Sequence, residues 1–188
     1  YTVMLNEAVD FLDIENNPDG IYIDATLGAG GHSELILQKL SDKGRLISFD
    51  IDKDAIKAAS NRLKGYKNLT IVNRSYTEIK EVLAELGIEK ITGGVIFDLG
   101  ASFHQLTKGE RGFSFKKDAP LDMRFNQEQK FSAYDVVNKY KEEELVEIFS
   151  KYGEEHFSKR IAKAIVNSRP INTTLKLAEL IESSPPKV

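Results

Sequence analysis

The chain has 188 residues, no cysteine and three histidines, so disulfides and cysteine-based metal sites are excluded and no metal site is expected. Its net charge of −3 argues against a protein that coats nucleic acid non-specifically. No apolar run approaches the ~20 residues of a membrane span, and no charged-then-apolar leader opens the chain. A cytoplasmic protein without membrane contact is therefore the expectation.

The charge is unevenly distributed along the chain. Residues 1–100 carry 11 Lys+Arg and 16 Asp+Glu, net −5, whereas residues 101–188 carry 15 and 13, net +2. A polyanionic partner would meet the second half more easily. The sequence opens on Tyr1 rather than Met and stops shortly after a helical pattern, which favours a fragment of a longer protein.

Strand and helix patterns alternate over the first hundred residues. Short β-branched and aromatic runs predict strands, and stretches with apolar residues at helical spacing predict helices between them. The predicted order is strand 20–26, helix 32–40, strand 44–50, helix 52–66, strand 68–75, helix 76–88 and strand 91–100. This order predicts right-handed βαβ units in a parallel sheet. The last strand would be an exposed edge, covered either by the helical segment or, as we favour, by strands beyond Val188.

The alternation stops after Gly100, and three parts are predicted. Residues 1–100 form the first half of an α/β domain, residues 101–131 an irregular loop segment for substrate or cofactor, and residues 132–188 a helical domain. Five phenylalanines argue against disorder in the loop segment. They are Phe103, Phe113, Phe115, Phe125 and Phe131. The predicted helices are 133–140, 142–153, 155–169 and 173–183.

A glycine cluster, Gly28, Gly30 and Gly31, lies between the first strand and the first helix in "DATLGAGGH". A glycine-rich turn lets the backbone approach a ligand, and the following helix directs its free N–H groups at it. Asp50 ends the second strand 22 residues after Gly28, where a carboxylate can accept ribose hydroxyls. The pattern favours an adenosine-bearing cofactor. The alternative is a turn that only packs helix on strand, with Asp50 as a helix cap.

The residues around the glycines bear on which cofactor is bound. The dinucleotide fingerprint requires Gly or Ala at position 33, where Ser33 stands. An acid before the glycines, here Asp24, is typical of S-adenosylmethionine sites, where it orders the loop or meets the methionine ammonium. S-adenosylmethionine is therefore favoured over NAD.

The fourth predicted strand ends in "FDLGASFHQL", and such strand ends face the ligand crevice. Asp98 is a candidate to hold an acceptor nitrogen, the alternative being a cap of the following turn. Ser102 and Gln105 are placed to act, whereas His104 is more readily a surface residue than a base. Tyr76, after the third strand, could stack on an adenine ring or pack on the core.

Cations and aromatic rings alternate in "ERGFSFKKDAPLDMR", residues 110–124, as in readers of single-stranded RNA. Acids are interleaved, so a self-packed Ω-like loop is an equal alternative. The residues concerned are Arg111, Phe113, Phe115, Lys116, Lys117 and Arg124. A second cationic set, Lys159, Arg160 and Lys163, is interpreted as a solvated helix face in preference to a phosphate-binding stripe.

Together these stretches resemble the bacterial 16S rRNA cytosine-N4 methyltransferases (RsmH/MraW-like). The matching stretches are "VMLNEAVDFL", "GIYIDATLGAGGHS", "GRLISFDIDKDAI", "DLGAS", "ERGFSFKKDAPLDMR", "YGEEHFSKRIAKAIV" and "TTLKLAELI". The resemblance implies a Rossmann-like methyltransferase sheet, of which the first four parallel strands are present, with an inserted helical domain. It implies S-adenosyl-L-methionine as donor and a cytidine of 16S rRNA or the small ribosomal subunit, near the decoding centre, as acceptor. Its implied cofactor contacts are Gly30, Gly31, His32, Asp50, Tyr76, Asp98 and Gln105.

Two departures from the family pattern stand out. The family usually reads D-L-G-V-S-S-P-Q where this chain has "DLGASFHQ", so Phe103 and His104 replace a small Ser and a Pro in the stretch expected to line the acceptor pocket. The family also continues beyond the position of Val188. The first departure thus falls on the acceptor side of the expected site, whereas the cofactor-binding pattern is retained.

The resemblance implies direct in-line transfer of a methyl group to the cytosine amino nitrogen. Asp98, with Gln105 nearby, would accept hydrogen bonds from that nitrogen as positive charge develops. The target base must leave its stack to reach the crevice. The alternatives are a non-catalytic RNA-binding remnant and, less favoured, an NAD-dependent oxidoreductase.

Overall fold

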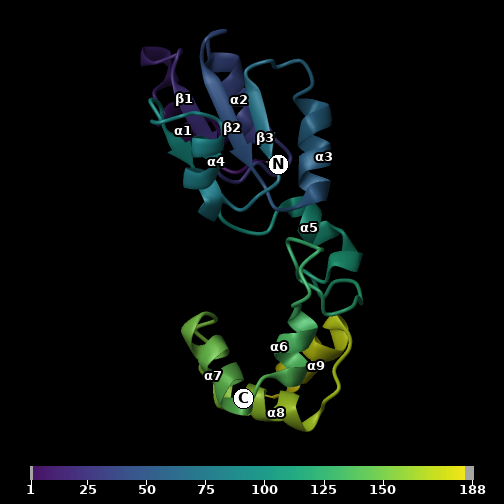
Figure 1. Ribbon diagram of the computed structural model, residues 1–188. Coiled ribbons are helices and arrows are strands. Elements are labelled where there is room, and N and C mark those ends of the chain that lie inside the picture. Colours follow the sequence, from purple (N-terminus) through teal and green to yellow (C-terminus); the bar gives the residue numbers. More distant parts are fainter. Residues whose placement is uncertain (1, 185–188) are drawn as a thin grey trace. The chain divides into compact units, whose positions relative to one another are not determined.

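The computed structural model describes residues 2–184, apart from the side chains of Phe103 and His104 (Figure 1). The chain divides into two compact units, residues 1–100 and residues 101–188, and each is described by itself. Among the described residues no helix combines the length and the apolar character that crossing a bilayer requires.

The first unit is built on a four-stranded parallel sheet of order β3-β2-β1-β4. Its strands are β1 (Ile21–Asp24), β2 (Arg45–Phe49), β3 (Leu69–Val72) and β4 (Val95–Ile96). The predicted parallel α/β sheet is confirmed. The fourth strand is much shorter than predicted. Only two of the ten residues expected in it pair with β1.

Helices cover both faces of this sheet. They are α1 (Leu5–Asp10), α2 (Gly31–Lys39), α3 (Lys53–Arg62) and α4 (Ile79–Glu85), with 3-10 turns at Ile14–Asn16 and Tyr76–Glu78. Successive strand residues point to opposite faces. Tyr22 and Leu46 therefore pack in one core with α1, α2 and α3, whereas Ile23 and Ile47 pack in the other with α4. Helix α1 was not predicted.

The second unit contains a helical core and a structured loop segment. Helix α5 (Phe103–Thr107) and a 3-10 turn (Gly109–Arg111) lie inside the segment predicted to be irregular, which corrects that prediction. The further helices are α6 (Ala133–Lys139), α7 (Glu142–Lys151), α8 (Ser158–Asn167) and α9 (Thr174–Ser183). Helix α8 contacts α6, α7 and α9, and its Ile161 and Ile165 are buried together with Leu121 and Leu145. Leu121 thus attaches the loop segment to the helical core.

Candidate cofactor site and substrate segment

Asp24 closes β1 and organises the start of the glycine loop. Its side chain is fully buried and accepts hydrogen bonds from the Thr26 amide (3.1 Å) and the Ser33 hydroxyl (2.7 Å). Ser33 Oγ also lies 2.9 Å from Ser48 Oγ on the neighbouring strand, so Ser48 donates to Ser33 while Ser33 donates to Asp24. Of the two roles considered for Asp24, ordering the loop is the one with visible contacts.

Asp50 follows β2 and holds the same loop from the other side. Its Oδ2 accepts the Gly28 amide at 2.8 Å, and its Oδ1 accepts the Asp52 amide at 2.8 Å. Each carboxylate oxygen retains acceptor capacity beyond these bonds. Asp50 therefore joins the glycine loop to the start of α3, and it has lone pairs left for a ligand.

Burial has the same electrostatic effect on both acids. It raises the pKa of Asp24 above its ordinary value, against the opposing hydrogen bonds from Ser33 and Thr26. Burial also raises the pKa of Asp50, against the bonds from the Asp52 and Gly28 amides. At the carboxyl end of the sheet, burial thus opposes the ionisation of both acids, and their hydrogen-bond donors favour it.

The turn into α2 requires glycine for two different reasons. Gly30, the N-cap residue, has φ 82°, a left-handed conformation that L side chains rarely adopt. At Gly31 a Cβ would collide with the Thr2 hydroxyl, so the N-terminal segment lies directly on the turn. His32, which is 5% exposed, donates from Nε2 to the Val3 carbonyl at 3.1 Å. Its imidazole therefore anchors this N-terminal segment.

The end of β4 reaches the same edge. The Asp98 amide donates to Thr26 Oγ1 at 2.8 Å, while the Asp98 side chain is exposed. The Tyr76 ring packs edge-on against Phe97, with centroids 5.6 Å apart and an interplanar angle of 87°. Tyr76 is still 41% exposed, so part of its surface is open to a ligand. The first unit thus brings together Asp24, Gly28, Asp50 and Asp98.

The remaining predicted residues lie in the second unit. Ser102 and Gln105 cap α5 reciprocally, because the Ser102 amide donates to Gln105 Oε1 (2.8 Å) and the Gln105 amide donates to Ser102 Oγ (3.2 Å). Their roles toward substrate or cofactor stay predictions. The side chains of Phe103 and His104 lie outside the described residues.

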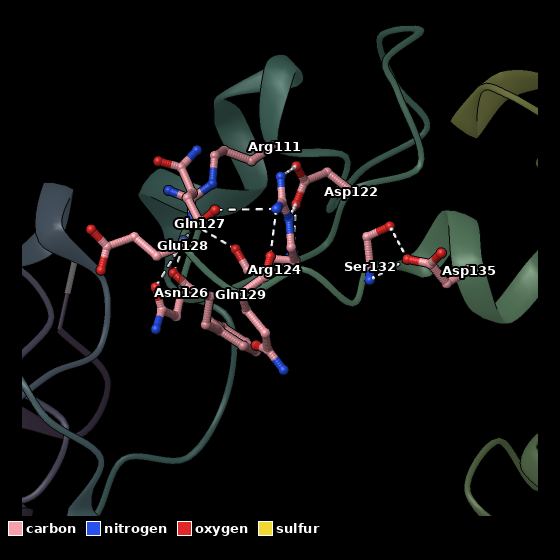
Figure 2. Close-up of polar contacts among 10 residues, drawn as sticks. Arg111, Asp122, Arg124, Asn126, Gln127, Glu128, Gln129, Ser132 and Asp135 are labelled. Carbon is pink, nitrogen blue, oxygen red and sulfur yellow. Dashed lines mark hydrogen bonds and ion pairs between the residues drawn. The ribbon is translucent and has the colours of Figure 1, made fainter.

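Arg124 is the centre of the loop segment (Figure 2). Its guanidinium forms a bidentate pair with Asp122, from Nε at 2.9 Å and from NH2 at 2.6 Å. Its third nitrogen donates to the carbonyls of Gln127 (3.1 Å) and Gln129 (2.6 Å). Arg124 lowers the pKa of Asp122, chiefly through the side-chain hydrogen bond. These contacts give Arg124 a part in the loop's own structure.

Arg111 is likewise built into the segment. It is 3% exposed and donates from NH2 to the carbonyls of Arg124 (2.8 Å) and Phe125 (3.2 Å). Its guanidinium carbon lies 5.9 Å from the centroid of the Phe113 ring, which packs against Phe125 at 5.0 Å. Phe115, in contrast, is 66% exposed. The predicted substrate role of Arg111, Phe113, Phe115 and Arg124 stays a prediction.

Several residues at the candidate site were missed by sequence reasoning. Thr26 links Asp24 to Asp98, Phe97 supports Tyr76, and Ser48 supports Ser33. A signal existed for one of them, since Ser48 is a polar residue inside an apolar strand and lies opposite Asp24 in the register. The cations Lys159, Arg160 and Lys163 are all exposed on α8.

A parallel sheet with a glycine-rich loop and acids at its carboxyl end defines a Rossmann-like α/β unit, here followed in sequence by a helical unit. The chain belongs to the MraW methylase family, whose family model matches residues 1–188. The resemblance seen in the sequence is thereby confirmed.

Curated relatives are similar over most of this chain. A ribosomal RNA small subunit methyltransferase H from Clostridium botulinum (strain Loch Maree / Type A3) is 53% identical over 98% of this chain and 60% of its own length. A protein of the same name from Caldicellulosiruptor bescii is 53% identical over the same shares. The chain thus spans about three fifths of the length of these relatives.

A solved rRNA methylase from Streptococcus thermophilus superposes on 53% of this chain and 56% of its own, with 25% identity and a TM-score of 0.44. Because this score is below 0.5, the fold assignment rests on the four-stranded sheet itself.

Proposed function

We propose that the protein binds S-adenosyl-L-methionine at the carboxyl end of its sheet and methylates N4 of a cytidine in small-subunit rRNA. Membership of the MraW methylase family and the name carried by the relatives, ribosomal RNA small subunit methyltransferase H, support the reaction class. An rRNA substrate implies the cytoplasm. The small ribosomal subunit, or its free 16S rRNA, is the proposed partner.

The observation that carries the proposal is the pairing of Asp50 with the glycine loop. The bond from Gly28 fixes this carboxylate beside a bare backbone turn, with acceptor capacity left for ribose hydroxyls. At the start of α2 the N-cap residue Gly30 has no side chain to satisfy the first-turn N–H groups, which favours an acceptor-bearing ligand there. The half-exposed Tyr76 ring supplies a surface for an adenine.

When bound, S-adenosylmethionine supplies an electrophilic methyl group on its sulfonium sulfur. The chain's task is to align the weakly nucleophilic cytosine amino group with that methyl. Asp98 is exposed at the same edge as Asp50 and would accept hydrogen bonds from the amino nitrogen as positive charge develops. We assign binding of the RNA substrate to the residues predicted for it from the sequence, and a cofactor contact to Gln105. The substrate residues are Ser102, Phe103, His104, Arg111, Phe113, Phe115 and Arg124.

Calorimetric titration with S-adenosylmethionine and, separately, with NAD tests the donor site. Asp50→Asn is the informative variant, because it removes the charge while leaving one acceptor oxygen for a backbone amide. Asp42→Asn, an exposed turn residue, is the matched control. We expect saturable binding of S-adenosylmethionine, weakened at least tenfold in Asp50→Asn and unchanged in Asp42→Asn. Preferential binding of NAD would overturn the proposal.

Transfer of a labelled methyl group to small-subunit rRNA tests the acceptor half. We expect Asp98→Asn to lower the rate of transfer by a larger factor than it lowers S-adenosylmethionine affinity, because Asp98 acts on the acceptor in addition to its implied contact with the cofactor. Cofactor binding without any transfer would favour the non-catalytic RNA-binding remnant.

A further inference from the structure

An apolar cavity of about 170 Å³ lies within the second unit, between the loop segment and one face of α9. The loop contributes Phe113, Phe115 and Met123, and the helix contributes a stripe at helical spacing. That stripe is Thr174, Leu177, Ala178 and Ile181. Phe115 and Met123 are 66% and 49% exposed, so the cavity has an open side.

The two side-chain oxygens of the cavity wall already make hydrogen bonds. Thr174 Oγ1 donates to the Lys117 carbonyl (3.3 Å) and accepts the Ala119 amide (3.2 Å), and Ser114 Oγ accepts the Lys116 amide (3.2 Å). The wall therefore offers a ligand van der Waals surface and aromatic faces rather than hydrogen bonds. Such a wall suits a flat ring held by stacking.

The size of the cavity limits what enters it. An apolar cavity of roughly 150 Å³ can hold benzene, whereas drug-sized ligands occupy roughly 300–1,000 Å³. A cavity of about 170 Å³ therefore suits one six-membered ring. The rest of the ligand must lie outside, along the open side.

The charges beside the cavity favour an anionic group for the part of the ligand that lies outside it. Lys116 and Lys117 follow Phe115 directly and are exposed, and residues 101–188 carry 15 Lys+Arg against 13 Asp+Glu. Two acids of the segment adjoin the cavity, and both already have partners. The Asp118 carboxylate accepts the Leu175 amide at 3.2 Å as a cap of α9, and Asp122, between the lining residues Leu121 and Met123, pairs with Arg124 at 2.6 Å. A ligand with one ring inside the cavity and phosphates beside the lysines matches these features.

We propose that this cavity holds one unstacked nucleobase of single-stranded RNA, with the adjoining phosphates at Lys116 and Lys117. The inference rests on the proposed function for the identity of the nucleic acid. It adds the face of α9 to the substrate surface, a role that the sequence motifs did not assign to this helix. Because the side-chain oxygens of Thr174 and Ser114 already make hydrogen bonds, the cavity binds mainly by stacking. Its size favours a pyrimidine over a purine, and stacking alone does not distinguish cytosine from uracil.

The test compares a fluorescein-labelled hexacytidylate with an abasic oligomer of the same number of phosphates, by fluorescence anisotropy with the full chain. Ala178→Phe fills the cavity, and Leu175→Phe places the same ring at an exposed position of the same helix outside the cavity. Phe115→Ala removes the exposed ring without touching the core, should Ala178→Phe fail to fold. Thermal melting verifies the fold of each variant.

We expect hexacytidylate to bind more tightly than the abasic oligomer, and Ala178→Phe and Phe115→Ala to weaken it by about fivefold or more, the lower end of base–aromatic stacking. Leu175→Phe should leave binding unchanged. Equal binding of both oligomers, absence of binding, or full affinity in folded Ala178→Phe would each overturn the inference. Titration of the same variants with S-adenosylmethionine distinguishes the two proposals. Loss of the donor site would lower cofactor binding in the titration, whereas it would not change oligonucleotide binding in the anisotropy measurement.

Discussion

Ser33 donates a 2.7 Å hydrogen bond to Asp24, a carboxylate that is fully buried at the end of β1. This contact explains why a serine stands where a dinucleotide-binding loop would have Gly or Ala. The hydroxyl compensates in part for the burial that raises the pKa of Asp24. The pair joins the first turn of α2 to β1, so it fixes the geometry of the glycine loop between them.

Ser33→Ala tests this relationship. The substitution leaves a buried carboxylate without its side-chain donor, and bonds to charged groups contribute about 1.5–3 kcal/mol. We expect the free energy of unfolding in urea to fall by about that amount. Ser60→Ala, at an exposed position of α3, should change it by less than about 0.5 kcal/mol. Equal effects of the two substitutions would show that the bond is unimportant.

Gly31→Ala should displace the N-terminal segment. The new methyl group would collide with Thr2 Oγ1, and Thr2 adjoins the Val3 carbonyl that accepts from His32. We expect faster amide hydrogen exchange over residues 2–5 and weaker S-adenosylmethionine binding. The double variant Thr2→Gly/Gly31→Ala removes the clash and should recover most of the affinity. A double variant no better than Gly31→Ala would place the damage in the turn itself.

The stability of the second unit should depend on acid through Asp135. The hydrogen bond from Lys139 and that from the Ser132 amide lower the pKa of Asp135 to about 2 from its ordinary 3.8. A lowered pKa means that the charged form stabilises the fold above pH 3.8, and that this contribution is lost as the pH falls from 3.8 to about 2. Figure 2 shows the Ser132 pair at the start of α6.

Asp135→Asn should therefore have a flatter melting temperature between pH 5 and pH 2 than the wild type, measured by circular dichroism at 222 nm. Glu179→Gln, at an exposed position of α9, is the control and should follow the wild-type curve. An Asp135→Asn curve parallel to the wild type would contradict the assignment.

The outer edge of β4 should promote self-association of this chain. Val95, Phe97 and Leu99 are 37%, 49% and 68% exposed beside a strand that pairs on one side with β1. Exposed apolar edges recruit further strands, and a lysine on the edge opposes this. We expect Val95→Lys to reduce concentration-dependent association in sedimentation velocity. Val3→Lys removes an equally apolar but non-edge side chain and should not reduce it.

The sequence predicts the α/β alternation and the glycine loop because both have local patterns. The short β4 was not predictable in this way. Just before β4, Gly93 lies so close to the Tyr22 ring that a Cβ would be 2.5 Å from it, a contact with a residue 71 positions away that local patterns do not reveal. The role of Ser33 was also hidden, since a serine at the start of a helix does not reveal which carboxylate it meets.

The loop segment shows the same limit more strongly. Its composition left RNA binding and self-packing equally open, and the structure has Arg111 and Arg124 bonded within the segment. These bonds depend on a backbone course that only distant partners fix. The spacing of residues in the sequence does not indicate those partners.

The bond between Ala119 and Thr174 has a consequence for the order of folding during synthesis. The Thr174 amide donates to the Ala119 carbonyl at 2.8 Å, and the Leu121 amide donates to the Asn172 carbonyl at 3.3 Å. When the ribosome has made residues 117–125, these partners are still about fifty codons away. The first unit can complete its βαβ contacts in that interval, because domains generally fold as units in the order of synthesis. The segment proposed to meet RNA therefore completes these contacts only after α9 has been made, later than the first unit can fold.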